Sequence, residues 1–177
     1  MPAFTVIDHT EIGSGGAASW TKSSIPSTYD HLLLKASIRT EDLNSAAEVL
    51  YIKLNNDSGT NYSNTDLYVG GAGSPSSFRN TSQTSANRTF AVRDGMTANT
   101  YGSLSIWIPH YANTSNYKQM LSDGASEANT TGSGPHWEMV ASLWQSTAAI
   151  NRIDITPSTS DLKQYSSITL YGITNNA

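Results

Sequence analysis

The stretch HLLLKASIR (residues 31–39) alternates apolar and polar side chains with a period of two. One face of this stretch carries the apolar residues Leu32, Leu34, Ala36 and Ile38. The residues between them, which are mostly polar, share the opposite face, because successive side chains of an extended chain point in opposite directions. The stretch therefore predicts a β-strand with one packed face and one face in water.

The same alternation returns along the whole chain. Strong runs lie at residues 50–54, 104–108, 137–143, 153–155 and 168–172, and weaker runs lie at 4–12, 62–69, 89–92 and 117–122. In the run 137–143 the alternating apolar positions are Trp137, Met139, Ala141 and Leu143. The pattern predicts an all-β protein, a single-domain jelly-roll-like antiparallel β-sandwich of about eight to ten strands.

Length, composition and charge indicate the number of domains and exclude some classes of partner. The 177 residues show no fixed repeat, so we expect one domain over residues 1–177. The absence of cysteine excludes disulfides and thiolate metal sites. A net charge of −4 argues against binding nucleic acid, which needs clustered Lys and Arg. No apolar run approaches the roughly 20 residues that span a bilayer, so no membrane partner is expected. Residues 1–12 also lack the basic and then apolar pattern of an export signal.

Long polar segments separate some of the runs. Residues 70–88 and 123–135 hold few large apolar side chains, and we expect them to form long loops. Residues 40–49 have the composition for a short helical turn, which would not change the fold class.

Residues able to do chemistry are scattered. The histidines, at positions 9, 31, 110 and 136, show no metal-binding spacing, and no Gly-x-Ser-x-Gly motif is present. Acids such as Asp57, Asp94 and Asp123 stand in turn-like contexts, where Asp bonds its own backbone. We therefore predict no catalytic residue, no cofactor and no metal ligand, and a protein that is not an enzyme.

Two other uses of these polar residues stay open. Residues 55–59 suggest a calcium loop, but the twelve-residue pattern with its closing Glu is missing, so a turn is favoured. A carbohydrate-active enzyme on the same scaffold would require two acids converging in a groove.

Aromatic side chains are the remaining candidates for contacts with a partner. Trp107 falls on the polar face of its run, and Tyr111 follows the strand end set by Pro109. Large aromatics contribute strongly to binding surfaces, so we expect Trp107 and Tyr111 to contact a partner.

Several segments together resemble structural proteins of tailed bacteriophages, including phages of cyanobacteria and other aquatic hosts. These segments are YDHLLL (29–34), LNNDSGTNYS (54–63), IWIPHYANT (106–114), WQSTAAINRI (144–153) and SITLYGI (167–173). They follow one another along nearly the whole chain, and each is short and structural. The resemblance supplies no catalytic residue.

The resemblance implies a virion β-sandwich. We expect a capsid decoration, or cement, protein on the outer capsid surface, with the major capsid protein as its partner and a homotrimer as its assembly. The lack of a coiled-coil shaft and the chain end soon after Ile173 favour the capsid surface. The alternative is a tail or fibre module that binds host surface glycan through exposed aromatic rings.

In the capsid role, two segments are the expected contact elements. Residues 1–12 would act as an N-terminal contact arm or an edge strand that adds to a neighbouring sheet. Residues 70–88 would order on binding. The contact residues expected in these segments are Phe4, Val6, Phe78 and Arg79.

Overall fold

The chain is built from β-strands, which confirms the all-β prediction. The computed structural model describes residues 3–44, 46–71, 73–129 and 136–175, except the side chain of Arg88. The strands of this part of the chain are β1 (Ala3–Glu11), β2 (Trp20–Lys22), β3 (His31–Thr40), β4 (Glu48–Leu54), β5 (Tyr62–Gly70), β6 (Pro75–Gln83), β7 (Ala86–Arg93), β8 (Gly102–Pro109), β9 (Lys118–Ala125), β10 (His136–Trp144), β11 (Ile153–Pro157) and β12 (Ser167–Thr174). The described residues contain no helix that could cross a membrane.

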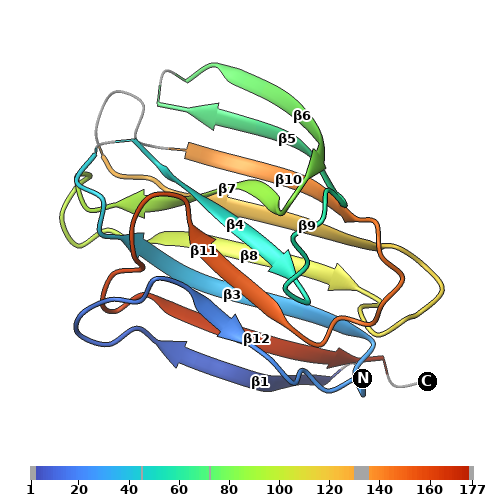
Figure 1. Cartoon of the computed structure of the whole chain (residues 1–177). Helices are drawn as coiled ribbons and strands as arrows, with labels where there is room; N and C mark the ends of the chain where they lie inside the picture. The colour runs from blue at the N-terminus through green and yellow to red at the C-terminus, as the bar shows by residue number, and fades with distance from the viewer. Residues whose placement is uncertain (1–2, 45, 72, 130–135, 176–177) are drawn as a thin grey trace.

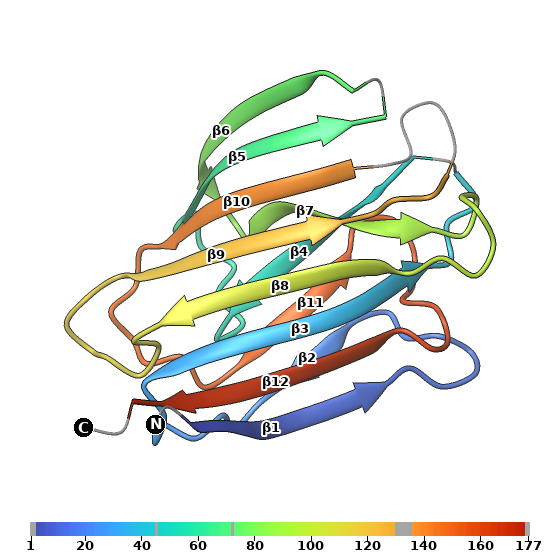
Figure 2. The same cartoon turned by 180° about the vertical axis from the view of Figure 1, so that it is seen from behind.

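The strands form two layers. The large sheet has the order β1-β12-β3-β8-β9-β10-β5-β6, and the small sheet has the order β2-β11-β4-β7. The small sheet lies in front of the large sheet in Figure 1 and behind it in Figure 2. All neighbours within each sheet run antiparallel, and a short parallel pairing of β3 with β7 links the sheets. This strand order does not confirm the finer prediction of a jelly roll.

The hydrophobic core lies between the two layers. Leu34, Ile106 and Leu170 enter it from the large sheet, and Leu50 and Ile155 enter it from the small sheet. Each of these side chains is at most 1% exposed, and each contributes roughly 1.5–3 kcal/mol on burial. The alternation in residues 31–39 thus gives the correct strand, since Leu32, Leu34 and Ile38 are buried.

The polar segments also form strands. Residues 70–88 were expected to be a loop, but most of them belong to β6 and β7. Residues 123–125 belong to β9, and residues 130–135 lie outside the described part of the chain. β6 is an edge strand paired with β5, and an edge strand tolerates polar side chains on both faces. The expected helical turn in residues 40–49 is absent from the described residues of that segment.

A buried arginine holds the junction between the two sheets. Arg39 lies at the parallel β3–β7 pairing, and its side chain is 3% exposed. Its guanidinium donates to the Asp94 carboxylate at 3.0 Å. It also donates to the backbone carbonyls of Asp94, Met96, Thr97 and Thr100. Arg39 therefore fixes the segment after β7 against the end of β3.

Candidate interaction surface on the large sheet

A row of apolar side chains crosses the outer face of the large sheet. Direct cross-strand pairing places its members next to one another, because paired residues of antiparallel strands share a face. In order across the sheet the row is Val6, Tyr171, Leu33, Trp107, Leu121 and Ala141. We call these residues the apolar row. The row runs from the edge strand β1 to β10.

More apolar side chains surround the β10 end of the row. Leu67 and Met139 pair directly across β5 and β10, and Trp137 follows on β10. These three side chains and Leu121 are each 44–46% exposed. A shallow groove of about 280 Å³ runs between Leu67, Leu121 and Met139. Large apolar side chains gathered on one face are typical of an interaction surface.

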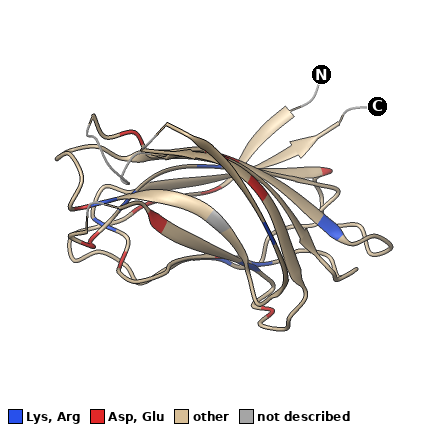
Figure 3. Cartoon of the chain, turned by 90° about the horizontal axis from the view of Figure 1, so that it is seen from above, with Lys and Arg blue, Asp and Glu red and all other residues tan. Residues whose placement is uncertain are grey.

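Charged side chains are few around the apolar row. A mostly polar row lies beside it and includes Lys35, Ser105 and Asp123, which pair across β3, β8 and β9. Figure 3 shows how sparsely Lys, Arg, Asp and Glu are distributed over the ribbon. Depletion of charge at the centre and polar groups at the rim is the usual composition of a protein interface.

The structure shows which side chains of β10 lie on the outer face of the large sheet. Trp137, Met139 and Ala141 point outward, whereas Glu138 and Val140 are buried against the small sheet. The sequence shows only that the side chains alternate. The packing of β7 against β10 decides which of the two alternating sets is buried. The more polar of the two sets of side chains therefore faces inward, and the apolar set remains on the surface.

Some of the predicted contact residues lie on this outer face. Val6 and Trp107 are members of the apolar row, and Phe4 packs edge-on against Tyr171 with ring centroids 6.5 Å apart. Arg79 pairs with Thr65, which lies beyond Ala141 along the same line. The structure therefore brings four predicted residues to one surface.

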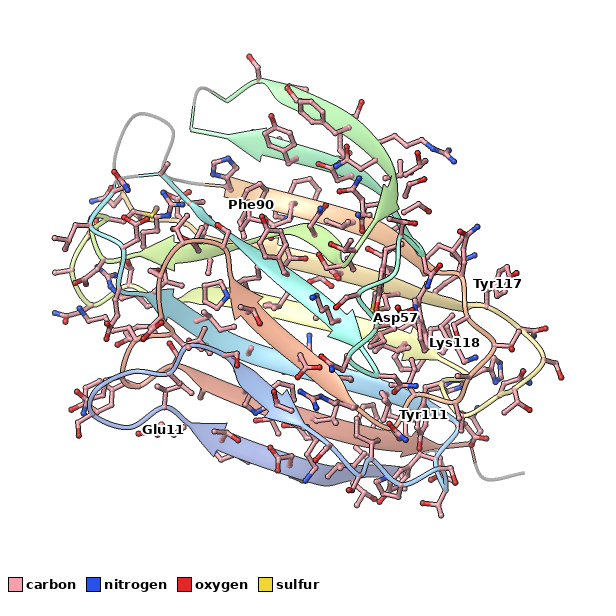
Figure 4. The ribbon with its side chains drawn as sticks, viewed as in Figure 1. Glu11, Asp57, Phe90, Tyr111, Tyr117 and Lys118 are labelled. Carbon is pink, nitrogen blue, oxygen red and sulfur yellow. The ribbon has the colours of Figure 1, made fainter. Side chains whose placement is uncertain are left out.

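Two predicted contact residues lie elsewhere. Tyr111 is fully buried, and its hydroxyl donates to the Pro26 carbonyl, so it is a core residue and not a contact residue. The chain reverses at His110, which has a φ of 47°, and this reversal turns Tyr111 inward. Phe78 is half exposed but pairs with the buried Asp66, and its ring stacks on Tyr68. Phe78 therefore faces away from the apolar row. Figure 4 labels Tyr111 and, at the edge of the molecule, the exposed Tyr117.

Sequence reasoning missed the members of the surface on β5 and β9. Leu67 and Leu121 stand in weak runs whose apolar residues were not assigned to a face. The signal was present, since both alternate with buried polar residues such as Asp66 and Ser122. This alternation could be assigned to a face only after the strands that neighbour β10 were known.

The 55–59 stretch forms a turn, as predicted. Asp57 accepts hydrogen bonds from the Gly59 backbone at 2.8 Å and from the Trp144 indole at 2.7 Å. The indole and the Asn61 amide are the main groups that hold the pKa of Asp57 below its usual value. Among the described residues, no group of three or more His, Cys, Asp or Glu side chains is placed to hold a metal ion.

Two acids, Asp66 and Glu138, are buried between the sheets and interact electrostatically. Glu138 accepts a hydrogen bond from the Phe90 backbone at 3.0 Å, and Gly124 leaves the space for its carboxyl group. Burial, together with repulsion from Asp123 and Asp66, raises the pKa of Glu138 to about 7. Glu138 has no exposed surface, so it cannot touch a substrate in this conformation.

Comparisons with protein-family models, with curated proteins and with solved structures find no match to this chain.

Proposed function

We propose that this protein is a structural protein of a tailed-phage virion, a decoration or cement protein that binds across neighbouring major capsid subunits on the outer surface of the shell. The observation that carries the proposal is the apolar row that crosses the large sheet from Val6 to Ala141. The resemblance of segments such as residues 29–34 and 106–114 to phage structural proteins supports the choice of partner.

The physical basis of such a role is burial of surface across subunit boundaries. A stable protein interface covers roughly 800 Å² of each partner, and a broad, flat sheet face offers a surface of that kind. Because the protein binds only the assembled shell, its binding free energy adds to the stability of the shell. Trp107 near the centre of the row is the expected anchor, since buried aromatic residues dominate binding energy.

Replacing Leu121 by Lys tests this surface. Leu121 lies between Trp107 and Ala141 in the row, and its side chain is 45% exposed, so the fold tolerates the change. A lysine there places an unpaired charge in the interface. We expect the affinity for capsids that lack this protein to fall about 30-fold or more, equivalent to about 2 kcal/mol. Co-sedimentation of the protein with such capsids measures the loss.

Leu43→Lys is the matched control for this experiment. Leu43 is 80% exposed and lies between β3 and β4, away from the row. Leu43→Lys is expected to bind as the unchanged protein does, and circular dichroism checks that both variants fold. Equal binding by both variants would remove the large sheet from the proposed interface.

The proposal includes a homotrimer. β1 is an edge strand that pairs only with β12 in the described part of the chain, so its outer edge is available for pairing with a second copy. Closed threefold assembly would let one small surface be used three times. Analytical ultracentrifugation is expected to give the mass of three chains, and a monomer at high concentration would contradict this part of the proposal.

A further inference from the structure

A second surface lies on the outer face of the small sheet, opposite to the apolar row. It is a groove of about 500 Å³, within the roughly 300–1,000 Å³ usual for small-ligand sites. Its floor comes from three adjacent strands, where Thr21, Asp154 and Lys53 pair directly across β2, β11 and β4. Thr156 and Tyr51 form the next outward-facing pair of β11 and β4.

The rim of the groove is held in place by turns. Gln83 and Asn87 stand on one side, where β6 passes into β7, and Asn56 stands at the turn after β4. Asn56 adopts a φ of 55°, a conformation that Asn tolerates better than most residues. The buried Asn64 bonds both the backbone and the side chain of Asn87. The rim therefore presents amide groups from a fixed backbone.

Charges in the groove are largely neutralised within it. The Arg152 guanidinium donates to both oxygens of the Asp154 carboxylate at 2.7–3.0 Å. The Thr21 hydroxyl donates to the same carboxylate at 2.6 Å. Lys53 donates to the Ser58 hydroxyl at 3.1 Å. The charges of Arg152 and Asp154 are thus neutralised by each other, whereas Lys53, which bonds a neutral hydroxyl, keeps its positive charge in the groove.

Tyr51 provides the aromatic surface of the groove. Its side chain is 37% exposed on the floor, among hydroxyl and amide groups. An aromatic ring packs against the apolar C–H face of a pyranose, and hydroxyl and amide groups both donate to and accept from its hydroxyls. A lipid or another apolar ligand would require apolar walls, and a nucleic acid would require more free positive charge.

We propose that this groove binds an oligosaccharide. One sugar ring lies over Tyr51, and its hydroxyl groups bond to Thr156, Asn56 and Gln83. Lys53 lies in the groove as well and gives an acidic sugar a partner for its carboxylate. The groove and the apolar row lie on opposite faces of the sandwich, so a capsid bound by the large sheet leaves the groove open. This inference does not rest on the proposed capsid function.

A glycan array that carries neutral and uronic-acid-containing oligosaccharides tests the proposal on the full chain. We expect binding to a subset of these glycans, followed by a measurable affinity for the best ligand in isothermal titration calorimetry. Tyr51→Ala is expected to weaken that affinity tenfold or more. Thr156→Arg, which fills the groove from its floor, is expected to abolish binding.

Tyr117→Ala is the matched control, because Tyr117 is 56% exposed and does not line the groove. This variant is expected to bind as the unchanged protein does, and a preference for acidic over neutral glycans would identify Lys53 as part of the site. Thermal unfolding verifies that each variant folds. The proposal is overturned if no glycan of either kind binds, or if Tyr51→Ala and Thr156→Arg both retain full affinity.

Discussion

Replacing Arg39 by Ala is expected to lower the free energy of unfolding by about 3–5 kcal/mol. The guanidinium of Arg39 is almost fully buried and bonds the Asp94 carboxylate at 3.0 Å. It also satisfies four backbone carbonyls of residues 94–100. Alanine would remove a buried donor that all these acceptors share, which costs far more than the loss of an exposed ion pair. The Asp94 carboxylate would keep its pairing with Lys163, and the Thr97 carbonyl would keep its hydrogen bond from the Thr100 hydroxyl. Chemical denaturation followed by circular dichroism measures the change.

Two further variants separate this effect from a general loss of charge on β3. Lys35→Ala removes an exposed cation from the same strand and is expected to change stability by no more than about 0.5 kcal/mol. Arg39→Lys keeps the charge but loses the planar fork, so it should recover only part of the stability. If Arg39→Ala were as stable as Lys35→Ala, Arg39 would not hold the junction of the sheets.

The second large effect is a dependence of stability on pH. Burial raises the pKa of Glu138 from 4.5 to about 7 in the folded protein, so the folded state binds the proton more tightly than the unfolded state. Stability from this group is therefore fully present below pH about 4.5 and falls as pH rises toward about 7. At 1.36 kcal/mol per pH unit, the total loss is about 3 kcal/mol.

Glu138→Gln should abolish this part of the pH dependence, because glutamine does not titrate. Asp66 on β5 and Asp123 on β9 are the acids whose charges raise the pKa of Glu138, and the Phe90 backbone on β7 donates a hydrogen bond to its carboxyl group. The ring of His136 stacks on that of Phe90. The measured quantity is the difference in unfolding free energy between the unchanged protein and the variant from pH 4 to pH 8, in which contributions common to both proteins cancel.

Glu11→Gln is the control for the substitution itself, since Glu11 is exposed on β1. It is expected to follow the pH dependence of the unchanged protein. A Glu138→Gln profile that runs parallel to the unchanged protein at every pH would show that Glu138 carries no raised pKa. A profile that converges with it at low pH and lies above it near pH 8 is the expected result.

The two proposed binding surfaces lie on different sheets. The large sheet carries the apolar row, in which Leu121 and Trp107 are flanked by polar neighbours. The small sheet carries the polar groove with Tyr51 on its floor. Because the core binds the layers together, a substitution on one outer face should leave the other face unchanged. The variants Leu121→Lys and Tyr51→Ala therefore test independent properties.

The sequence determined the fold class and the positions of the strands with strong alternation. Residues 31–39 became β3 with Leu32, Leu34 and Ile38 buried, and Trp107 lies on the outer face, as its phase predicts. This part was accessible because alternation is a local property, since the backbone itself turns successive side chains to opposite faces.

Tertiary structure decided which strands are neighbours and which phase of each is buried. Three features depend on residues that are distant in sequence. These are the inward direction of the Glu138 side chain, the pairing of the polar β6 with β5, and the burial of Tyr111 after the turn at His110. The apolar row and the groove arise from the same cross-strand registers. The alternation of a strand depends only on its own residues. Its neighbours in the sheet depend on the packing of the whole chain, so no single segment determines them.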